Sequence, residues 1–187
     1  MRALADELHV SECQILELDA PTLSTGDITA ALRQSNILYM DGGNTFYLQH
    51  HLLRSAFWPS FKEHMATTGN YVYIGVSAGA IVAGNSIETA YWKGWDDPTA
   101  SGTISEEWTV DRKEGAKLAP DESFFMHYDA DIHQGLVEES SRRFEGSFLV
   151  RTVKNNNALI YGEDEKANHS NNVLFTFENI FENNLES

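Results

Sequence analysis

Short apolar runs alternate along the chain with segments whose apolar residues recur at helical spacing. Asn36–Met40 and Tyr71–Val76 are compact apolar runs bounded by polar residues, which predicts two buried strands. Between them, Thr45–Phe57 and Pro59–Thr67 predict two helices, and Ser77–Val82 predicts a third helix after the second strand. Strands and helices that alternate with short connections favour an α/β fold, in which helices cover both faces of a mostly parallel sheet.

The same patterns predict a single domain over residues 1–187, without internal repeats or a dividing linker. Further predicted strands are Cys13–Leu18, Phe124–Met126, Ala158–Tyr161 and Val173–Phe177, and further predicted helical segments are Met1–Leu8, Ile28–Leu32 and Gly135–Phe144. Residues 91–123 lack a sustained period, which predicts an irregular excursion that includes a hairpin. The Asn- and Glu-rich residues that follow Phe177 predict an exposed tail.

Charge narrows the range of partners. The 187 residues include 28 Asp and Glu against 13 Lys and Arg, a formal net charge of −15. This charge repels nucleic acids and anionic membranes, and no basic stripe offsets it. A single cysteine, Cys13, excludes an intrachain disulfide and a zinc finger. Because no secretory signal opens the chain and no apolar run approaches the ~20 residues that cross a bilayer, we expect a cytoplasmic protein.

The strongest chemical signal is Gly75-Val76-Ser77-Ala78-Gly79, which lies between a predicted strand and a predicted helix. A serine in such a turn projects its hydroxyl, and small neighbours leave room for a substrate. The backbone N–H of Ala78 would then face a developing oxyanion, where one such donor contributes about 2.7–4 kcal/mol. A tight turn with a capping serine is the purely structural alternative.

Asp41-Gly42-Gly43-Asn44 forms a second glycine-containing turn, after the preceding predicted strand. Because the carboxyl ends of parallel strands meet at one edge of a sheet, both turns are expected at the edge where such folds bind ligands. Glycines in this position allow the backbone to approach a ligand closely. A phosphate cradle is disfavoured, since the sequence contains neither a G-x-G-x-x-G nor a Walker pattern.

A serine nucleophile needs a general base, and the chain contains seven histidines. His127 follows the apolar residues Ser123–Met126 and precedes a loop, which brings its imidazole within reach of Ser77. His133 is the reserve candidate. A hydrogen-bonded structural role is the alternative for His127.

The acid that would orient this imidazole stays open on the residues alone. Glu163-Asp164-Glu165 follows a predicted strand, and Asp96-Asp97 lies in the aromatic excursion. Three adjacent carboxylates are also typical of a solvated turn. His127 and Asp129 are not part of a recognisable metal-binding pattern, so we expect neither a metal nor a cofactor.

In combination, these segments resemble peptidase family S51, the serine peptidase family that contains peptidase E and cyanophycinase. The resemblance depends on Gly42–Phe46 (GGNTF), Tyr73–Ala80 (YIGVSAGA) and Phe125–His127 (FMH), in this order and spacing. The first two motifs are specific as a pair. The resemblance implies a doubly wound sheet related to class I glutamine amidotransferases, with a cofactor-free serine site.

The resemblance also implies roles for particular residues. Ser77 would attack a carbonyl of a small peptide and His127 would transfer the proton. The N–H groups of Gly43 and Ala78 would form an oxyanion hole, and Asn44 would contribute to substrate binding.

The third catalytic residue differs among members of the family. Some use a glutamate after a late strand, a position that Glu165 matches best. Others use an aspartate in the loop after the nucleophile helix, where this chain has Trp92. Asp164 and Asp97 therefore stay as alternatives to Glu165.

Two departures from the family pattern shape further expectations. Peptidase E-like chains begin earlier, so we expect two N-terminal strands to be missing, and the incomplete sheet would invite a homodimer. Aspartyl specificity in peptidase E depends on an arginine in the helix after the histidine. Counting from His127 without gaps, the position of that arginine is occupied by Ser141 in this chain. Arg142 and Arg143, which follow it directly, are therefore the candidates for binding an acidic first residue of the substrate.

Three functions stay open. The preferred one is a serine peptidase that cleaves short, dipeptide-like substrates. The second is a catalytically impaired family member that acts as a binding or assembly protein. The third is an α/β-hydrolase esterase using Ser77, Asp97 and His127, and the GGNTF segment and the short Ser77-to-His127 separation count against it.

Overall fold

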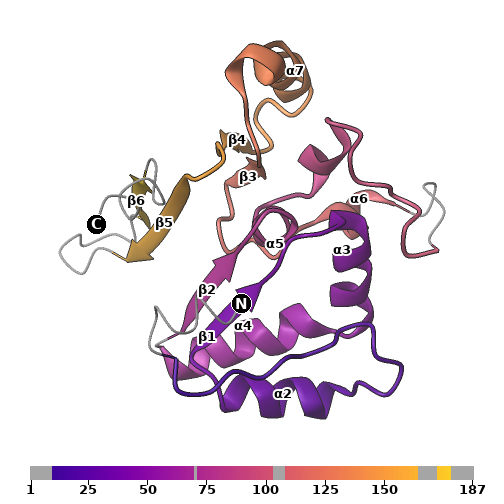
Figure 1. The fold of residues 1–187 in the computed structure, drawn as a ribbon, viewed down its shortest axis with the longest axis vertical. Helices are drawn as coiled ribbons and strands as arrows, with labels where there is room; N and C mark the ends of the chain where they lie inside the picture. The colour runs from indigo at the N-terminus through magenta and orange to yellow at the C-terminus, as the bar shows by residue number, and fades with distance from the viewer. Residues whose placement is uncertain (1–9, 70, 103–107, 164–171, 178–187) are drawn as a thin grey trace, which may run out of the picture.

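The computed structural model describes residues 10–69, 71–102, 108–163 and 172–177 (Figure 1). Its helices are α2 (Thr25–Arg33), α3 (Thr45–Arg54), α4 (Phe57–Thr68), α5 (Ala78–Ala83), the 3₁₀ helix η1 (Glu88–Tyr91), α6 (Val110–Lys113) and α7 (Ala130–Arg142). Its strands are β1 (Ile37–Met40), β2 (Val72–Gly75), β3 (Glu122–Phe125), β4 (Leu149–Thr152), β5 (Ala158–Glu163) and β6 (Asn172–Phe177). None of the helices in these ranges has the length and apolar character needed to cross a membrane.

The strands pair two by two. β1 and β2 are parallel, with Met40 opposite Gly75, and β3 and β4 are parallel, with Phe125 opposite Thr152. β5 and β6 form an antiparallel hairpin. The expected parallel pairing is therefore present. Across the described ranges, however, no ladder joins the three pairs, so a continuous doubly wound sheet is not observed.

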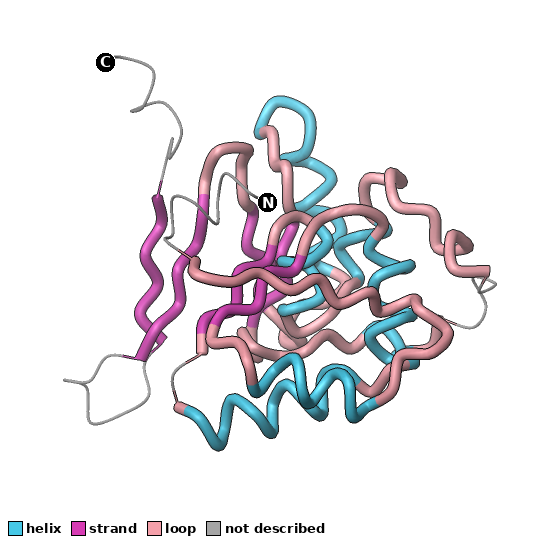
Figure 2. The backbone as a smooth tube through the Cα atoms, turned by 60° about the horizontal axis from the view of Figure 1, so that its bottom comes forward, coloured by secondary structure: helices cyan, strands magenta, loops and turns pink. Residues whose placement is uncertain are grey.

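Helix α5 links the two parallel pairs, because it contacts both β2 and β3 (Figure 1). Helices α2 and α4 pack against each other at the bottom of that view, and α7 lies at the top. Figure 2 shows the β5–β6 hairpin at the left, outside the helices. The hydroxyl of Tyr161 donates a hydrogen bond to the carboxylate of Glu122, which connects the hairpin to β3.

The main core lies among α2, α3 and α4. Ile28, Phe46, Leu52 and Phe61 are completely buried there. Phe57 stacks on Phe61, with ring centroids 5.9 Å apart. Burial of each such side chain contributes about 1.5–3 kcal/mol, so this apolar cluster is the main source of stability around the first parallel pair.

Helix α2 contains the predicted helical segment Ile28–Leu32 and begins after the capping residue Ser24. The Ser24 hydroxyl accepts from the N–H of Asp27 at 3.2 Å, and the Asp27 carboxylate accepts from the N–H of Ser24 at 2.9 Å, a complete capping box. The predicted helix Thr45–Phe57 ends earlier, because Ala56 has a left-handed backbone with φ of 54°. Phe57 instead begins α4, whose first turn accommodates a proline.

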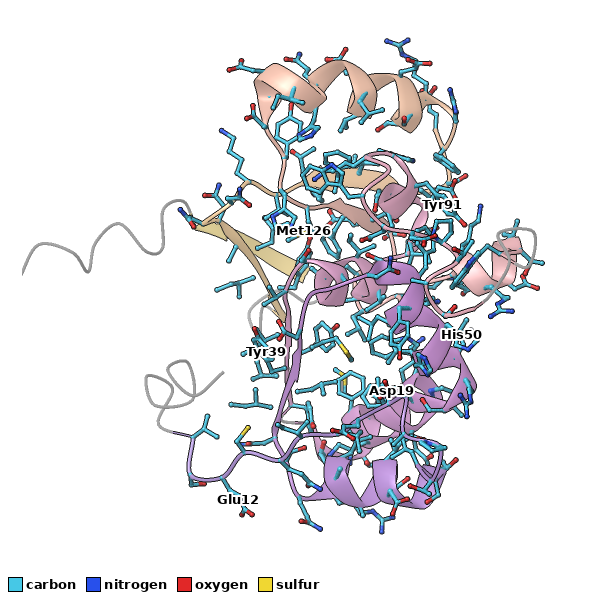
Figure 3. The ribbon with its side chains drawn as sticks, turned by 45° about the vertical axis from the view of Figure 1, so that its right-hand side comes forward. Glu12, Asp19, Tyr39, His50, Tyr91 and Met126 are labelled. Atoms are coloured by element: carbon cyan, nitrogen blue, oxygen red, sulfur yellow. The ribbon has the colours of Figure 1, made fainter. Side chains whose placement is uncertain are left out.

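The predicted strand Cys13–Leu18 is wrong. The segment runs extended without a strand partner among the described residues, while Leu16 and Leu18 pack on the core and Ile15 is 70% exposed. The alternation of apolar and polar residues that indicated a strand therefore arises because Leu16 and Leu18 face the core while their neighbours face the solvent. The segment leads to Asp19, labelled in Figure 3, whose carboxylate accepts a hydrogen bond from Tyr47 of α3 at 2.8 Å.

The excursion predicted over residues 91–123 is irregular, as expected, but its described part contains the helical turn α6 and no hairpin. An antiparallel bridge between Ser86 and Glu114 closes it. The buried Gln49 of α3 donates to the carbonyl oxygens of Arg112 at 3.1 Å and Glu114 at 2.8 Å. The hydrogen bonds of the buried Gln49 side chain thus hold residues 112–114 against α3. The periodicity of apolar residues in the sequence does not reveal such a polar contact.

Two differences concern the second parallel pair. Strand β4 was not predicted, because its four residues, LVRT, are half polar and show no clear alternation. Helix α7 begins at Ala130, capped by Asp129, instead of at Gly135. The predicted helical segment Met1–Leu8 and the predicted tail after Phe177 lie outside the described residues.

Two glycines bring α5 against the first parallel pair. A Cβ atom at Gly79 would lie 2.2 Å from the carbonyl oxygen of Met40, at the end of β1. A Cβ atom at Gly75 would lie 2.7 Å from the backbone of Gly79. These distances are far below a normal contact, so only glycine allows the helix to start this close to both strands.

We therefore expect Gly79→Ala to lower the free energy of unfolding by more than about 3 kcal/mol, since the added methyl group meets rigid backbone. Urea denaturation measures this. The matched control is Gly135→Ala in α7, where nothing lies within 4 Å of the new Cβ atom and alanine favours the helix by roughly 0.5–1 kcal/mol. Equal stability of Gly79→Ala and the wild type would contradict this close packing.

Candidate active site

Ser77 occupies the turn between β2 and α5. It precedes the first residue of α5 and has φ of 50° and ψ of −110°, a backbone conformation that non-glycine residues rarely adopt. Such a conformation costs of order 1–3 kcal/mol and persists only where surrounding structure enforces it. Here the close packing of Gly75 and Gly79 enforces it, and the half-buried serine projects from the end of the strand pair.

The Ser77 hydroxyl meets the imidazole of His127. The distance from Oγ to Nε2 is 2.8 Å, across 50 positions of the chain. His127 follows β3, directly after Met126, which Figure 3 labels, and also has a left-handed backbone, with φ of 54°. The carboxyl ends of β2 and β3 thus bring together the two residues that the sequence singled out.

The other nitrogen of the imidazole contacts a residue that the sequence analysis missed. Nδ1 of His127 lies 2.7 Å from Oδ1 of Asn155, which follows β4. In the sequence, Lys154-Asn155-Asn156-Asn157 indicates only a turn, because asparagine is common in turns. No local signal identifies Asn155, and the strand that positions it was not predicted either.

The second glycine turn lies beside Ser77. A Cβ atom at Gly42 would lie 3.3 Å from the Cβ atom of Ser77, and Gly43 has φ of 125°. Within the described ranges, the N–H groups of Gly43 and Ala78 donate to no protein acceptor. Asn44 caps α3, since its Oδ1 accepts from the N–H of Tyr47 at 2.9 Å.

The side-chain amide of Asn44 also donates to the carbonyl oxygen of Asp97 at 3.0 Å, which ties the glycine turn to the aromatic excursion. The Asp97 carboxylate accepts from the N–H of Thr99 at 2.8 Å and from its hydroxyl at 2.7 Å, and these bonds lower the pKa of Asp97. The Asp96 carboxylate accepts from the N–H of Thr45 at 3.2 Å. The Asp96 carboxylate therefore binds the start of α3, and the Asp97 carboxylate binds Thr99 within the excursion.

The structure does not bring Asp97 to His127, so the esterase arrangement of Ser77, Asp97 and His127 is not formed. The other candidate acids, Asp164 and Glu165, lie outside the described residues.

A cavity of about 450 Å³ opens beside His127. Its lining residues are Trp92, Lys93, Trp95, His127, Asp129, Ile132, His133, Leu136 and Asn155. The reserve base His133 is therefore near the site, but its Nδ1 accepts from the N–H of Asp129 at 3.0 Å. Arg142 and Arg143 do not line the cavity. They are exposed at the end of α7, where Arg143 pairs with Glu139 at 3.3 Å.

Lys93 supplies the cationic side chain of this cavity. Its ammonium group donates to the carbonyl oxygens of Met126 and, at 3.3 Å, of His127. It also lies 4.3 Å from the ring centroid of Trp95 and 4.4 Å from that of Phe125. Partial burial lowers the pKa of Lys93 to about 8, against the opposing attraction of Asp96.

Among the described residues, no three His, Cys, Asp or Glu side chains are grouped so that they could hold an ion. A serine hydroxyl on a constrained turn, hydrogen-bonded to an imidazole and adjacent to unpaired backbone N–H groups, is an arrangement suited to attack on a carbonyl.

Comparison with known sequences places the chain in a peptidase family. The sequence model of Peptidase family S51 matches residues 1–103, so the chain belongs to this family. The matched region includes Ser77 and both glycine turns, whereas His127 and Asn155 lie beyond it.

Three curated relatives are named as uncharacterized peptidases. One from Listeria innocua is 26% identical over 151 residues, which cover 81% of this chain and 67% of the relative. One from Listeria monocytogenes is 28% identical, covering 76% of this chain and 64% of the relative. A third, from Pasteurella multocida, is 36% identical over 72 residues, 34% of its length. The chain thus spans about two thirds of the length of the two Listeria relatives.

The fold resembles the crystal structure of a protein from Listeria monocytogenes EGD-e that is provisionally named peptidase E. The TM-score is 0.61 at 23% sequence identity, and the alignment covers 88% of this chain and 69% of that protein. This likeness establishes a shared peptidase E-like fold.

The half-buried position of Lys93 predicts a specific effect of pH on stability. Between its lowered pKa of about 8 and the ordinary value of 10.5, the folded chain binds fewer protons at Lys93 than the unfolded chain does. The contribution of Lys93 to the free energy of unfolding therefore increases as pH rises through this range. We expect the wild type to gain stability relative to Lys93→Met between about pH 7 and about pH 10.

Urea denaturation of both proteins at the two pH values measures this difference, because other titrating groups are common to both. A stability difference that stays constant, or that moves in favour of Lys93→Met at high pH, would show that Lys93 is not desolvated in the folded chain.

Proposed function

We propose that this chain is a serine-type peptidase that cleaves short peptides through an acyl-enzyme on Ser77. The observation that carries this proposal is the 2.8 Å contact between Ser77 Oγ and His127 Nε2. A general base within hydrogen-bonding distance of a hydroxyl is the geometric requirement for its activation. Membership of a peptidase family supports the same chemistry.

In the proposed reaction, His127 accepts the proton of the Ser77 hydroxyl as the oxygen bonds to the carbonyl carbon of the substrate. The carbonyl oxygen becomes an oxyanion, which the N–H groups of Gly43 and Ala78 stabilise. When the C–N bond breaks, the imidazolium returns its proton to the departing amine. A water molecule then attacks the acyl-enzyme, His127 accepts its proton, and the acid product leaves with the serine restored.

The cavity beside His127 supports a small peptide substrate. Its volume of about 450 Å³ lies within the range of small-ligand pockets, roughly 300–1,000 Å³. Trp92 and Leu136 provide apolar wall, and Lys93 provides a positive charge in a chain of net charge −15. We propose that Lys93 binds an acidic first residue, since Arg142 and Arg143 lie outside this cavity.

Replacement of the nucleophile tests the reaction. Ser77→Ala is expected to lower turnover of short peptides by at least about a thousandfold, because no other group can form the acyl-enzyme. Cleavage of a dipeptide library measures turnover. A fluorophosphonate probe should label the wild type and leave Ser77→Ala unlabelled.

The matched control is Ser60→Ala in α4, since the Ser60 hydroxyl donates to the carbonyl oxygen of Ala56, the residue that precedes this helix. This variant should keep both cleavage and labelling. Undiminished turnover in Ser77→Ala would refute the serine mechanism.

Removal of the positive charge of Lys93 tests the proposed preference for substrates with an acidic first residue. Lys93→Gln should lower kcat/KM for peptides with an acidic first residue by about tenfold or more beyond its effect on neutral peptides, because a charge-assisted hydrogen bond contributes about 1.5–3 kcal/mol. The effect on neutral peptides measures the separate loss of the contacts between Lys93 and the carbonyl oxygens of Met126 and His127. In the wild type, the acidic preference should weaken as pH rises through about 8, where Lys93 loses its proton.

Arg142→Gln and Arg143→Gln are the controls for this substrate test. If either arginine variant loses the acidic preference while Lys93→Gln keeps it, the cation has been assigned to the wrong residue.

The alternative function is that of a binding protein with an impaired site. The observation in its favour is that the described partner of His127 Nδ1 is a neutral amide. A binding protein would retain affinity for short peptides in calorimetry while neither cleaving them nor reacting with a fluorophosphonate.

A further inference from the structure

The imidazole of His127 is held on both of its nitrogen atoms. Nε2 meets the Ser77 hydroxyl at 2.8 Å, and Nδ1 meets Oδ1 of Asn155 at 2.7 Å. We propose that Asn155 is the positioning residue of this site, so that the chain works with a serine, a histidine and a neutral asparagine. This inference depends on the proposed serine mechanism and adds to it the residue that orients the base.

The chemistry of the amide fixes the proton on His127. A side-chain amide oxygen accepts hydrogen bonds and never donates them, so Nδ1 must carry the hydrogen of this contact. In the neutral imidazole, Nε2 then presents its lone pair to the Ser77 hydroxyl. This is the tautomer that a general base for Ser77 requires.

Pairing of β3 and β4 delivers Asn155 to this position. Beyond the end of the ladder, the N–H of Val153 donates to the carbonyl oxygen of Phe125, and the N–H of Tyr128 donates to that of Val153, both at 2.9 Å. Val153 is buried, which anchors the turn that follows it. His127 and Asn155 therefore sit on neighbouring, hydrogen-bonded segments whose register is fixed.

The backbone of His127 is restrained as well. Lys93 donates to the carbonyl oxygens of Met126 and His127, which holds the left-handed turn at φ of 54°. Asn155 then determines the remaining freedom of the ring, its rotation about the side chain. An exposed imidazole would otherwise sample several rotamers, of which few face Ser77.

Among the described residues, no charged side chain near the His127 ring is hydrogen-bonded to its Nδ1 atom in place of Asn155. Lys93 and Asp129 line the same cavity with opposite charges, and His133, also in the cavity, accepts from the N–H of Asp129. The Asp129 carboxylate accepts from the N–H of Asp131 at 3.0 Å and thereby caps α7. Lys154 is the exposed charged neighbour of Asn155 in its turn.

A neutral amide differs from a carboxylate in one measurable way. Both orient the ring, but only a carboxylate adds a negative charge that favours the protonated imidazole. Asn155→Asp should therefore move the acidic limb of the Ser77 labelling rate towards higher pH by about 1 unit, while labelling at high pH is retained. The readout is the rate of fluorophosphonate labelling as a function of pH.

The matched control is Asn156→Asp. It introduces the same charge in the same turn, and the positive φ of Asn156, 62°, is one that aspartate tolerates. Because the contact with His127 belongs to Asn155, this variant should leave the acidic limb in place. Equal movement of the limb in both variants would reveal a general charge effect and overturn the inference.

Removal of the amide tests the orientation itself. Asn155→Ala should lower the labelling rate about a hundredfold, whereas urea denaturation should show little loss of stability for an exposed turn residue. Wild-type labelling rates in Asn155→Ala would overturn the positioning role while leaving the serine mechanism intact. Loss of labelling in Ser77→Ala would confirm the latter separately.

The tautomer provides a test that needs no reaction. Nitrogen NMR of histidine-labelled protein, with His127→Gln to assign the signal, should show Nδ1 of His127 protonated in the neutral ring and the Nε2 form increasing in Asn155→Ala. If the wild type does not react with the probe, this measurement decides alone. A wild-type ring protonated on Nε2 would overturn the inference.

Discussion

The close contact between the start of α5 and the ends of β1 and β2 is the constraint on which the site depends. Gly79 lies so near the carbonyl oxygen of Met40, and Gly75 so near Gly79, that no side chain fits at either position. The chain must therefore reverse sharply at Ser77, with a positive φ that the packing of its neighbours maintains. The cost of that conformation is offset by the burial of Ala78, Ile81 and Val82 of α5 around it, and the outcome is a hydroxyl held at one defined point.

The second parallel pair, β3 and β4, positions the residues that meet Ser77. β3 leads to His127 and β4 leads to Asn155, and because the strands are parallel both residues lie at the same end of the pair. Lys93, from the excursion after α5, fastens the His127 backbone and brings a positive charge into the adjoining cavity. Segments that are distant in sequence thus converge on one imidazole, which suits the proposed peptidase chemistry, and the cavity opens beside this imidazole.

The family match and the structural likeness cover different parts of the chain that forms the site. The S51 match covers residues 1–103, which include Gly43 and Ser77 and the helices α3 and α5 that follow them. The likeness to the peptidase E-like crystal structure extends over 88% of the chain and supports the fold beyond that match. His127 and Asn155 lie in this second region. There the neutral amide distinguishes the described site from a carboxylate-oriented triad, and it motivates both the positioning role proposed for Asn155 and the binding-protein alternative.

Sequence alone determined the features that depend on local patterns. The apolar runs of β1 and β2, the helical segment Ile28–Leu32, the serine turn and the histidine after β3 were all predicted, because periodicity and small residues are visible in neighbouring positions. Only the tertiary structure decided the rest. Cys13–Leu18 pairs with no strand in the described part of the chain, the predicted helix Thr45–Phe57 breaks at Ala56, and Asn155 meets His127 through a strand pair whose second member carries no local signal. Partner choice between distant segments arises from packing and hydrogen bonding of the whole chain, so no window of the sequence contains it.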